Sequence, residues 1–324
     1  MNDARIGLGL IGAGDVVQRF YLPTLAGHPR FRVTAIASPG GRSARALAER
    51  HAVPTVCDAA EALIARPDVD AVAVCTPPDS HLVIGAAALA AGKHVLMEKP
   101  IAPDYADCAA LLGAARRGGA ILYYAYNNRL RDENQALTAR VLSGALGPLE
   151  ALDVEWLRTK GMLDPLWWRD PARAGGGVLA DLGSHLLMIA LGLVPARTRF
   201  SASATLLRRS GNDADPEDVA VAHVVIDDAI GLTVRAGWGM ALAQPAIVNL
   251  RAFGRRGMAT NRDHDGPARD GYADLLDRFA AHIDARRQPD LGIVDDCARL
   301  LQALYDAGRS GGVVAGTFRG GGWS

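Results

Sequence analysis

Residues 6–14 read Ile-Gly-Leu-Gly-Leu-Ile-Gly-Ala-Gly, and this stretch indicates how the first 125 residues fold. A short apolar run without polar alternation ends at a Gly-Ala-Gly turn, as expected of a strand that is buried on both faces. Helix-forming residues follow the turn directly. The glycines permit a tight turn in which the backbone and a helix N-terminus approach a pyrophosphate. The stretch therefore predicts a dinucleotide-binding βα unit with phosphate contacts from Gly12, Gly14, Asp15 and Val16.

The alternation of short apolar runs and helical stretches continues to residue 125. Further apolar runs lie at 33–37, 71–75, 94–97 and 121–124. Repeated strand–helix–strand units of this length require right-handed crossovers and a parallel sheet. We therefore predict that residues 1–125 form a doubly wound (Rossmann) α/β domain.

After residue 125 the pattern changes to longer, partly alternating apolar runs that are separated by Gly, Asp and Pro. The runs lie at 149–157, 198–208, 219–226, 230–240 and 246–254, and helical patterns lie at 130–143, 177–191, 272–286 and 295–308. Runs in which apolar and polar residues partly alternate, bounded by turn residues, are typical of antiparallel strands with one solvated face. Residues 126–324 are thus expected to form an α+β domain with a large, mostly antiparallel open sheet.

The composition excludes several classes of function. Lys plus Arg and Asp plus Glu each number 35, so the formal net charge is zero, which argues against nucleic-acid or membrane-surface partners. The first residues lack a signal-peptide pattern, and no apolar run approaches the ~18 residues of a spanning helix. The cysteines are widely separated and form no Cys-x-x-Cys pair. Buried reduced thiols and a cytoplasmic location are therefore expected.

The segment after the second apolar run bears on the choice of cofactor. The run ends at Ala37, and Ser-Pro-Gly-Gly-Arg follows at positions 38–42. NAD-specific folds commonly place an Asp or Glu there for the ribose 2′-hydroxyl, whereas a Ser hydroxyl and an Arg fork suit a 2′-phosphate. The sequence favours NADP(H) over NAD, with Ser38 and Arg42 as contacts. The alternative is that Arg42 is only a solvated residue at the start of a helix.

Glu98-Lys99-Pro100 follows the apolar run at 94–97, at the carboxyl edge where open α/β sheets bind ligands. A lysine ammonium at that edge can hydrogen-bond a substrate oxygen and exchange its proton. The same tripeptide is also common in surface turns, so on its own it indicates a site only weakly.

A second cluster follows the three glycines at 175–177. Asp181 and His185 lie four residues apart, so on a helix they share one face. A carboxylate beside an imidazole fixes its tautomer and orientation, as a general base requires, although a structural pair would look the same. The glycines before the pair allow the backbone to approach a ligand closely. Two ligands are too few for a metal site, and none is expected.

These motifs occur in one order along the chain, together with Thr76-Pro77-Pro78, His81 and Trp168-Arg169. In that order they resemble the glucose–fructose oxidoreductase/inositol dehydrogenase (Gfo/Idh/MocA) family over almost the whole chain. The resemblance implies an NAD(P)-dependent enzyme that oxidises or reduces a hydroxyl or keto group of a sugar-like or cyclitol-like small molecule. It also implies that residues 126–324 bind the substrate and pair through their open sheet in a homodimer or homotetramer.

The resemblance assigns a role to each matching residue. Lys99 looks like the catalytic lysine, with Asp181 and His185 as its partners and His185 as the general acid/base. The residues expected beside the cofactor are Thr76, Pro77, His81, Glu98, Lys99, Trp168 and Arg169. Residues after the 121–124 run leave the sheet at the same edge and are expected either to hold substrate hydroxyls or only to cap the domain junction; they are Tyr126, Asn127, Asn128 and Arg129.

Two positions depart from the family pattern. Val17 occupies the third small position of the glycine turn, and Met188 stands where many relatives carry an acidic residue near the substrate. Without that carboxylate, a more apolar or deoxygenated substrate is expected. Two other functions stay open, an NAD-dependent glycosidase of the same fold and a non-catalytic nucleotide- or sugar-sensing regulator. Joint retention of Lys99, Asp181 and His185 speaks against the regulator.

Overall fold

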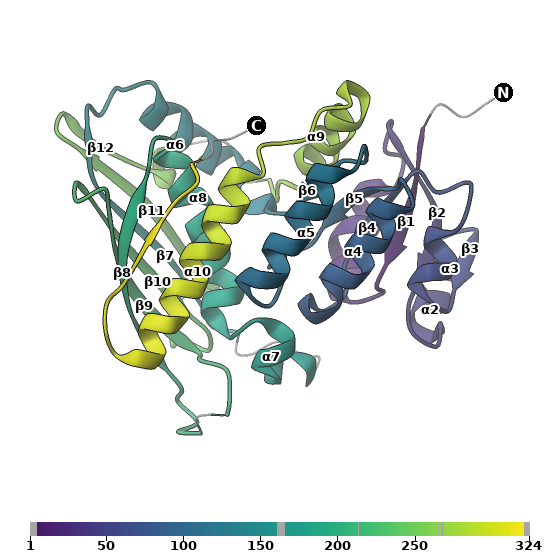
Figure 1. Cartoon of the computed structure of the whole chain (residues 1–324), viewed down its shortest axis with the longest axis horizontal. Coiled ribbons are helices and arrows are strands. Elements are labelled where there is room, and N and C mark those ends of the chain that lie inside the picture. The colour runs from purple at the N-terminus through teal and green to yellow at the C-terminus, as the bar shows by residue number, and fades with distance from the viewer. Residues whose placement is uncertain (1–4, 161–165, 213, 265, 267–268, 321–324) are drawn as a thin grey trace. The chain divides into compact units, whose positions relative to one another are not determined.

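The computed structural model describes residues 5–160, 166–212, 214–264, 266 and 269–320 (Figure 1). The chain divides into two compact units. The first takes the residues up to Ala102 together with Ala106–Asn127 and Tyr272–Pro289. The second takes Pro103–Tyr105, Asn128–Gly271 and the residues from Asp290 onward.

The first unit is built on a six-stranded parallel sheet with the strand order β3-β2-β1-β4-β5-β6. Its strands are β1 (Ile6–Ile11), β2 (Phe31–Ala37), β3 (Thr55–Cys57), β4 (Ala71–Val74), β5 (His94–Met97) and β6 (Leu122–Tyr124). The strand order reverses direction at β1 and β4, the switch point at which such sheets bind ligands. The predicted doubly wound fold is confirmed, although the prediction omitted the short strand β3.

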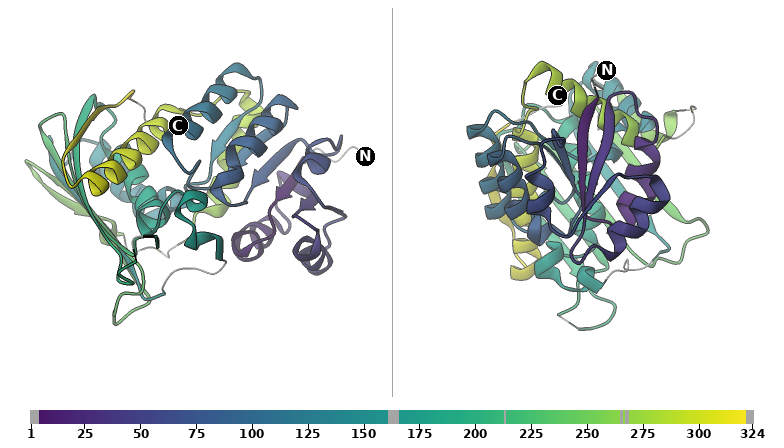
Figure 2. Two further views of the ribbon diagram at one scale, coloured as in Figure 1. Left: turned by 60° about the horizontal axis from the view of Figure 1, so that its bottom comes forward. Right: turned by 90° about the vertical axis from the view of Figure 1, so that its right-hand side faces the viewer.

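Helices cover both faces of this sheet, as the right-hand view of Figure 2 shows. They are the π-helix Val17–Tyr21, α1 (Leu22–Leu25), α2 (Arg42–His51), α3 (Ala60–Ile64), the 3-10 helix Pro78–Ser80, α4 (His81–Ala90), α5 (Tyr105–Arg117) and α9 (Tyr272–Ala285). Cover on both faces explains why all four side chains of β4 are fully buried and why the strands read as continuous apolar runs.

Helix α9 belongs to this unit although it lies far along the sequence. Tyr272 stacks on Phe20 with 4.8 Å between ring centroids, and Phe279 stacks on Phe31 at 5.8 Å. The expected boundary at residue 126 assigns the segment 272–289 to the second domain instead. The aromatic contacts join residues more than two hundred positions apart, so no local sequence pattern could show that α9 belongs to the first unit.

The second unit contains a seven-stranded sheet with the order β12-β11-β7-β10-β9-β8-β13. Its strands are β7 (Leu149–Arg158), β8 (Arg199–Leu207), β9 (Val219–Ile226), β10 (Ile230–Gly237), β11 (Ala246–Gly254), β12 (Gly257–Thr260) and β13 (Val314–Thr317). The β7–β10 pair is parallel, and the other pairs are antiparallel. The predicted, mostly antiparallel sheet is confirmed; the prediction missed β12 and β13, which lie at its two edges.

Helices pack on one face of this sheet, and α10 runs along β8 (Figure 1). The helices are the 3-10 helix Asn127–Leu130, α6 (Asp132–Leu142), the 3-10 helix Leu166–Arg169, α7 (Pro171–Ala174), the π-helix Leu179–Gly183, α8 (Ser184–Leu193), the 3-10 helix Asn261–Asp263 and α10 (Gly292–Ser310). The helical stretch 171–193 is long and apolar enough to cross a membrane, contrary to the expectation from sequence. Its apolar window is wholly buried in the protein, as in a core helix.

Candidate active site

The turn after β1 has the backbone geometry that a pyrophosphate requires. Gly12 has a φ of 108°, and a Cβ on it would lie 2.5 Å from the Cys75 carbonyl oxygen, so only glycine fits. Space is open at Gly14, where a Cβ would meet no described heavy atom within 4 Å beyond its chain neighbours. A helix begins at once, with the Gln18 amide donating to the Gly14 carbonyl over 3.1 Å. Open backbone at a helix N-terminus fits the dinucleotide phosphates.

The helix after this turn departs from α geometry where the sequence departs from the glycine motif. Val17 is fully buried and begins the π-helix that ends at Tyr21. Such single-turn π segments are frequent at functional sites. Asp15, expected at the phosphates, is exposed and lies 3.2 Å from the Arg19 guanidinium, which balances its charge beside the turn.

Glu98 links this helix to the strand end that carries Lys99. The buried carboxyl accepts from the Tyr21 hydroxyl over 2.9 Å and from the Lys99 amide over 3.0 Å. Burial raises the pKa of Glu98, while the Lys99 ammonium opposes that rise. Burial also raises the pKa of Tyr21 well above its usual value. Glu98 therefore holds the backbone of Lys99 in place at the carboxyl edge of the sheet.

His81, expected beside the cofactor, is fully buried between two loops. Its Nε2 lies 2.9 Å from the Thr76 carbonyl, and its Nδ1 lies 3.1 Å from that of Pro100 and 3.2 Å from that of Ile101. Burial lowers the pKa of His81, and the carbonyls counteract this. The ring therefore joins the segment that begins with Thr76 and Pro77 to the loop after Lys99.

The segment after β2 is arranged around the start of α2. Ser38 is buried, and its hydroxyl oxygen accepts from the Ala44 amide over 3.2 Å and from the Ser43 hydroxyl over 3.2 Å. Arg42 is exposed at the first position of the helix. Arg45, which sequence reasoning missed, donates to the Gly40 carbonyl over 2.8 Å. Its guanidinium also lies 3.4 Å from Asp58, and Ser38 holds the start of the helix.

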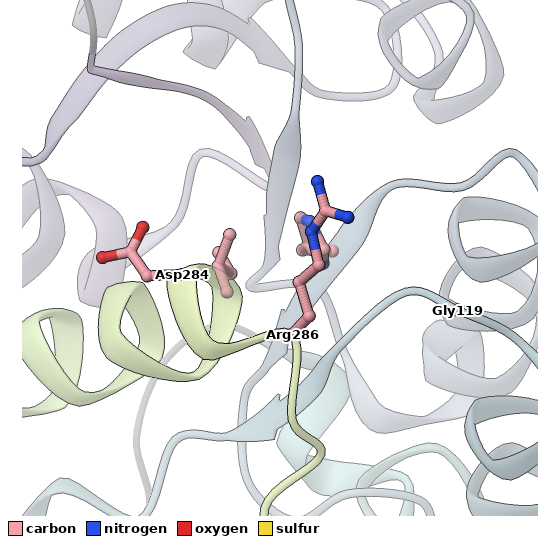
Figure 3. Close-up of a pocket in the computed structure, with 5 residues that line it drawn as sticks. Gly119, Asp284 and Arg286 are labelled. Carbon is pink, nitrogen blue, oxygen red and sulfur yellow. The ribbon is translucent and has the colours of Figure 1, made fainter.

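A cavity of about 580 Å³ lies at the opposite, amino edge of this sheet (Figure 3). It is lined by His94 at the start of β5, Gly119 before β6, and Ile283, Asp284 and Arg286 at the end of α9. Ligands of open α/β sheets bind at the carboxyl edge, so this cavity is not part of the dinucleotide site.

In the second unit, Asp181 lies buried in the π-helix Leu179–Gly183. Its Oδ2 accepts from the Trp238 indole Nε1 over 3.2 Å and lies 3.1 Å from Arg158 Nη2. The Arg158 guanidinium also lies over the Trp238 ring, 5.3 Å from its centroid. Burial lowers the pKa of Arg158, and Asp181 opposes this. Sequence reasoning missed both Arg158 and Trp238 as partners of Asp181.

His185 lies in the first turn of α8 and is buried. Its ring centroid is 5.6 Å from that of Trp156, with the planes tilted by 42°. The Asn128 side-chain nitrogen lies 3.5 Å from each ring nitrogen. Trp168 meets the buried Trp238 edge-on, with 6.1 Å between centroids. Asp181 and His185 therefore each lie beside a tryptophan side chain.

The structure distributes the remaining expected site residues over both units. Tyr126 and Asn127 are buried at the end of the first unit, after β6, whereas Arg129 is buried in the second. Arg169 is exposed beside the buried Trp168. Met188 is fully buried within α8.

The sequence of this chain matches the models of a known protein family. Residues 6–126 match the model of the oxidoreductase family with an NAD-binding Rossmann fold, and residues 134–260 match the GFO/IDH/MocA C-terminal domain. The chain is 31% identical over 314 residues to dTDP-3,4-didehydro-2,6-dideoxy-α-D-glucose 3-reductase of Streptomyces violaceoruber, covering 97% of this chain and 88% of that one. It is 30% identical to D-glucoside 3-dehydrogenase of Escherichia coli K12, covering 59% of this chain and 54% of that one.

Among solved structures, GenD2 from gentamicin A biosynthesis in complex with NAD superposes with a TM-score of 0.85 at 22% identity, over 96% of both chains. Levoglucosan dehydrogenase in complex with NADH and levoglucosan gives a TM-score of 0.83 at 18% identity, over 96% of this chain and 99% of that one. These likenesses show the same fold. With the two family models and the curated relatives, they establish that the chain belongs to the GFO/IDH/MocA family of oxidoreductases.

Proposed function

We propose that the protein transfers a hydride between a nicotinamide cofactor, NADP(H) in preference, and a hydroxyl or keto group of a sugar-like or cyclitol-like substrate. The observation that carries the proposal is that the first unit holds the groups expected to bind the cofactor and the second holds those expected to bind the substrate. The first has the open phosphate turn and Lys99 at the carboxyl edge of its sheet. The second has Asp181 and His185 buried among tryptophans.

The proton at the reacting oxygen is handled by Lys99 and His185 in this proposal. When bound, the nicotinamide supplies or accepts the hydride at the carbinol carbon. The Lys99 ammonium donates a hydrogen bond to the attached oxygen, and the His185 imidazole exchanges its proton. The Arg158 guanidinium lies 3.1 Å from Asp181 Oδ2, and a carboxylate oxygen at this place can accept a hydrogen bond from a substrate hydroxyl.

We further propose that the substrate lacks one or more hydroxyl groups of an ordinary hexose. Several relatives are named as 3-reductases of a 2,6-dideoxy sugar carried on dTDP. Met188, which is buried within α8, stands at the position where many family members carry an acidic residue, so this chain lacks the hydrogen-bond acceptor of that carboxylate.

A substrate panel tests the function. The purified protein is incubated with nucleotide-linked and free keto-sugars, deoxy-sugars and cyclitols, and oxidation or reduction of the cofactor is followed by fluorescence. We expect turnover of at least one deoxygenated sugar. Cleavage of a glycoside without net change of the cofactor would indicate the glycosidase instead. A rise in melting temperature with cofactor, but no turnover of any compound, would indicate a sensor.

The preference for NADP(H) gives a prediction at α2. Arg42→Ala is expected to raise the NADPH dissociation constant about ten- to hundredfold, because a charge-assisted contact contributes roughly 1.5–3 kcal/mol. The NADH dissociation constant should stay nearly unchanged. Ser38→Asp should reverse the preference, because an acidic side chain would repel the 2′-phosphate. Quenching of tryptophan fluorescence measures both affinities.

Arg50→Ala is the matched control, since Arg50 is also exposed and lies at the far end of the same helix. It should alter neither affinity. Equal wild-type affinities for the two cofactors, or an Arg42→Ala effect of equal size on both, would contradict the proposed preference.

We also propose a cytoplasmic homodimer or homotetramer that pairs through the uncovered face of the seven-stranded sheet. Residues on this face include Leu207 and Val225, which are 50% and 43% exposed. The Glu155–Arg235 and Asp153–Arg251 ion pairs lie on the same face. The four cysteines are free thiols, in keeping with a reducing compartment.

Val225→Asp is expected to shift the protein toward monomer in sedimentation velocity, because an unpaired charge is costly to bury in an interface. Val83→Asp is the control, because Val83 is 68% exposed on α4 in the first unit. A wild-type monomer, or no change with Val225→Asp, would argue against pairing through this face.

A further inference from the structure

The helical stretch that carries Asp181 and His185 has an acceptor outside the helix for each of its first backbone amides. The first four amides of a helix have no acceptor within the helix. Here each has a partner outside it, and the donors in order are Gly177 to Glu217 Oε2 (3.0 Å), Val178 to the Glu217 carbonyl (2.9 Å), Leu179 to Glu217 Oε1 (3.0 Å) and Ala180 to the Tyr305 hydroxyl (3.0 Å). A single residue, Glu217, thus accepts three of the four bonds.

Glu217 is a buried carboxylate in the second unit, only 1% exposed. The Tyr305 hydroxyl donates to its Oε1 over 2.8 Å. Burial raises the pKa of Glu217, while the Leu179 amide and the Tyr305 hydroxyl lower it. A negative charge at this point also meets the positive end of the helix dipole. The carboxylate therefore takes the place that an external anion would otherwise occupy.

Gly176 and Gly177, just before the helix, are explained by the same two residues. A Cβ on Gly176 would lie 1.9 Å from the Tyr305 hydroxyl oxygen, and a Cβ on Gly177 would lie 2.2 Å from the Glu217 carbonyl oxygen. The sequence suggested that these glycines let the backbone approach a ligand. In the structure they let it approach Glu217 and Tyr305.

Asp218, the residue after Glu217, is bonded to Trp238, which is also a partner of Asp181. The Trp238 amide donates to the Asp218 carbonyl over 2.8 Å, and the Trp238 indole donates to Asp181 Oδ2 over 3.2 Å. The contacts close a ring in which Glu217 holds the helix start, Asp218 holds Trp238, and Trp238 holds Asp181.

We propose that Glu217, assisted by Tyr305, is a positioning residue that sets the place of Asp181 and His185 for the reaction. The kinetic part of this inference rests on the proposed function. Its geometric part concerns the second unit alone and can be tested without a substrate.

Glu217→Gln replaces one carboxylate oxygen by an NH₂ group that faces a backbone N–H. We expect kcat to fall about tenfold or more, because small displacements of reacting groups are costly, while the cofactor KM stays within about twofold. Tyr305→Phe keeps the Glu217 carboxylate and the three backbone amide bonds that Glu217 accepts, so this variant is expected to fold even if Glu217→Gln does not. It should lower kcat by a smaller factor, roughly three- to tenfold.

Asp296→Asn is the matched control, because Asp296 is a buried carboxylate at the other end of α8. It pairs with Arg197 over 2.7 Å, and Arg197 donates to the Leu191 and Val194 carbonyls, 2.8 and 2.7 Å away, where α8 ends. This variant should lower the melting temperature but leave kcat within about twofold.

The indole N–H resonances of ¹⁵N-tryptophan-labelled protein give a readout that needs no turnover. Asp181→Asn identifies the Trp238 resonance by shifting it. Glu217→Gln and Tyr305→Phe should shift the same resonance, and Asp296→Asn should not. The proposal is overturned if Tyr305→Phe and a folded Glu217→Gln leave this resonance unmoved, or if Asp296→Asn lowers kcat as much as they do. If no sugar is turned over, the proposed function fails, and the resonance still decides the positioning role.

Discussion

Lys99→Ala is expected to lower kcat by about two orders of magnitude or more, while the dissociation constant of NADPH stays within about threefold. Lys99 directly follows the buried carboxyl of Glu98, which accepts from its backbone amide and so fixes the strand end. General acid–base groups typically contribute about 10²–10⁴-fold to a rate, and the alanine side chain can neither donate to nor protonate the substrate oxygen. Steady-state kinetics on the best substrate of the panel, with fluorescence titration of NADPH, measures both quantities.

Lys93 offers the matched control, because it precedes the same strand, β5, at its opposite end. Its ammonium donates to the Arg66 and Val69 carbonyls over 3.0 and 2.7 Å, which is a structural role. Lys93→Ala should therefore lower the melting temperature and leave kcat nearly unchanged. Near-normal turnover in Lys99→Ala would remove Lys99 from the mechanism.

The strands of both units could largely be predicted from the sequence, because buried apolar runs are local signals. Strands β1, β5, β9 and β11 have the predicted bounds. The missed strands, β3, β12 and β13, have three or four residues each and lie at sheet edges, where a strand is too short to show a period.

The surroundings of Asp181 could not be predicted, for a topological reason. Arg158 ends β7, and Trp238 follows β10. The sequence predicts a mostly antiparallel sheet, in which the carboxyl ends of neighbouring strands point in opposite directions, so it gives no reason to place Arg158 beside Trp238. The β7–β10 pair is parallel, with Gly237 opposite Leu157, so the next residues along both strands emerge side by side. The sequence did show that β7 ends in Trp-Leu-Arg and that a Trp follows β10, but it did not show that these two strands pair.

The glycine run at 175–177 shows how one pattern can serve two physical purposes. Glycine permits close approach of another group to the backbone, whether that group is a ligand or the protein itself. The acceptors come from Glu217 and Tyr305, forty or more residues away. Since one sequence does not show which distant residue fills the space, the ligand interpretation was the natural one, and the structure corrects it.

His185→Ala is expected to lower kcat by about 10²-fold or more and to remove one ionisation from the pH–rate profile. The ring lies beside Trp156 and within 3.5 Å of the Asn128 side-chain nitrogen, and both contacts help to orient it. Asn128→Ala should leave the ionisation in the profile but lower kcat by a smaller factor, since the imidazole is still present but loses a contact. His51→Ala, at the end of α2 in the first unit, serves as the control and should leave both unchanged.

Kinetics over a range of pH for these three variants distinguishes a titrating group from a packing group. A packing role for His185 would lower kcat by the same factor at every pH, because lost contacts do not depend on the proton concentration. A general acid/base role changes the shape of the profile, because the group that gains and loses the proton is gone. A profile of wild-type shape in His185→Ala would therefore place the proton transfer on another residue, with Lys99 the other proton-handling group in the proposed mechanism.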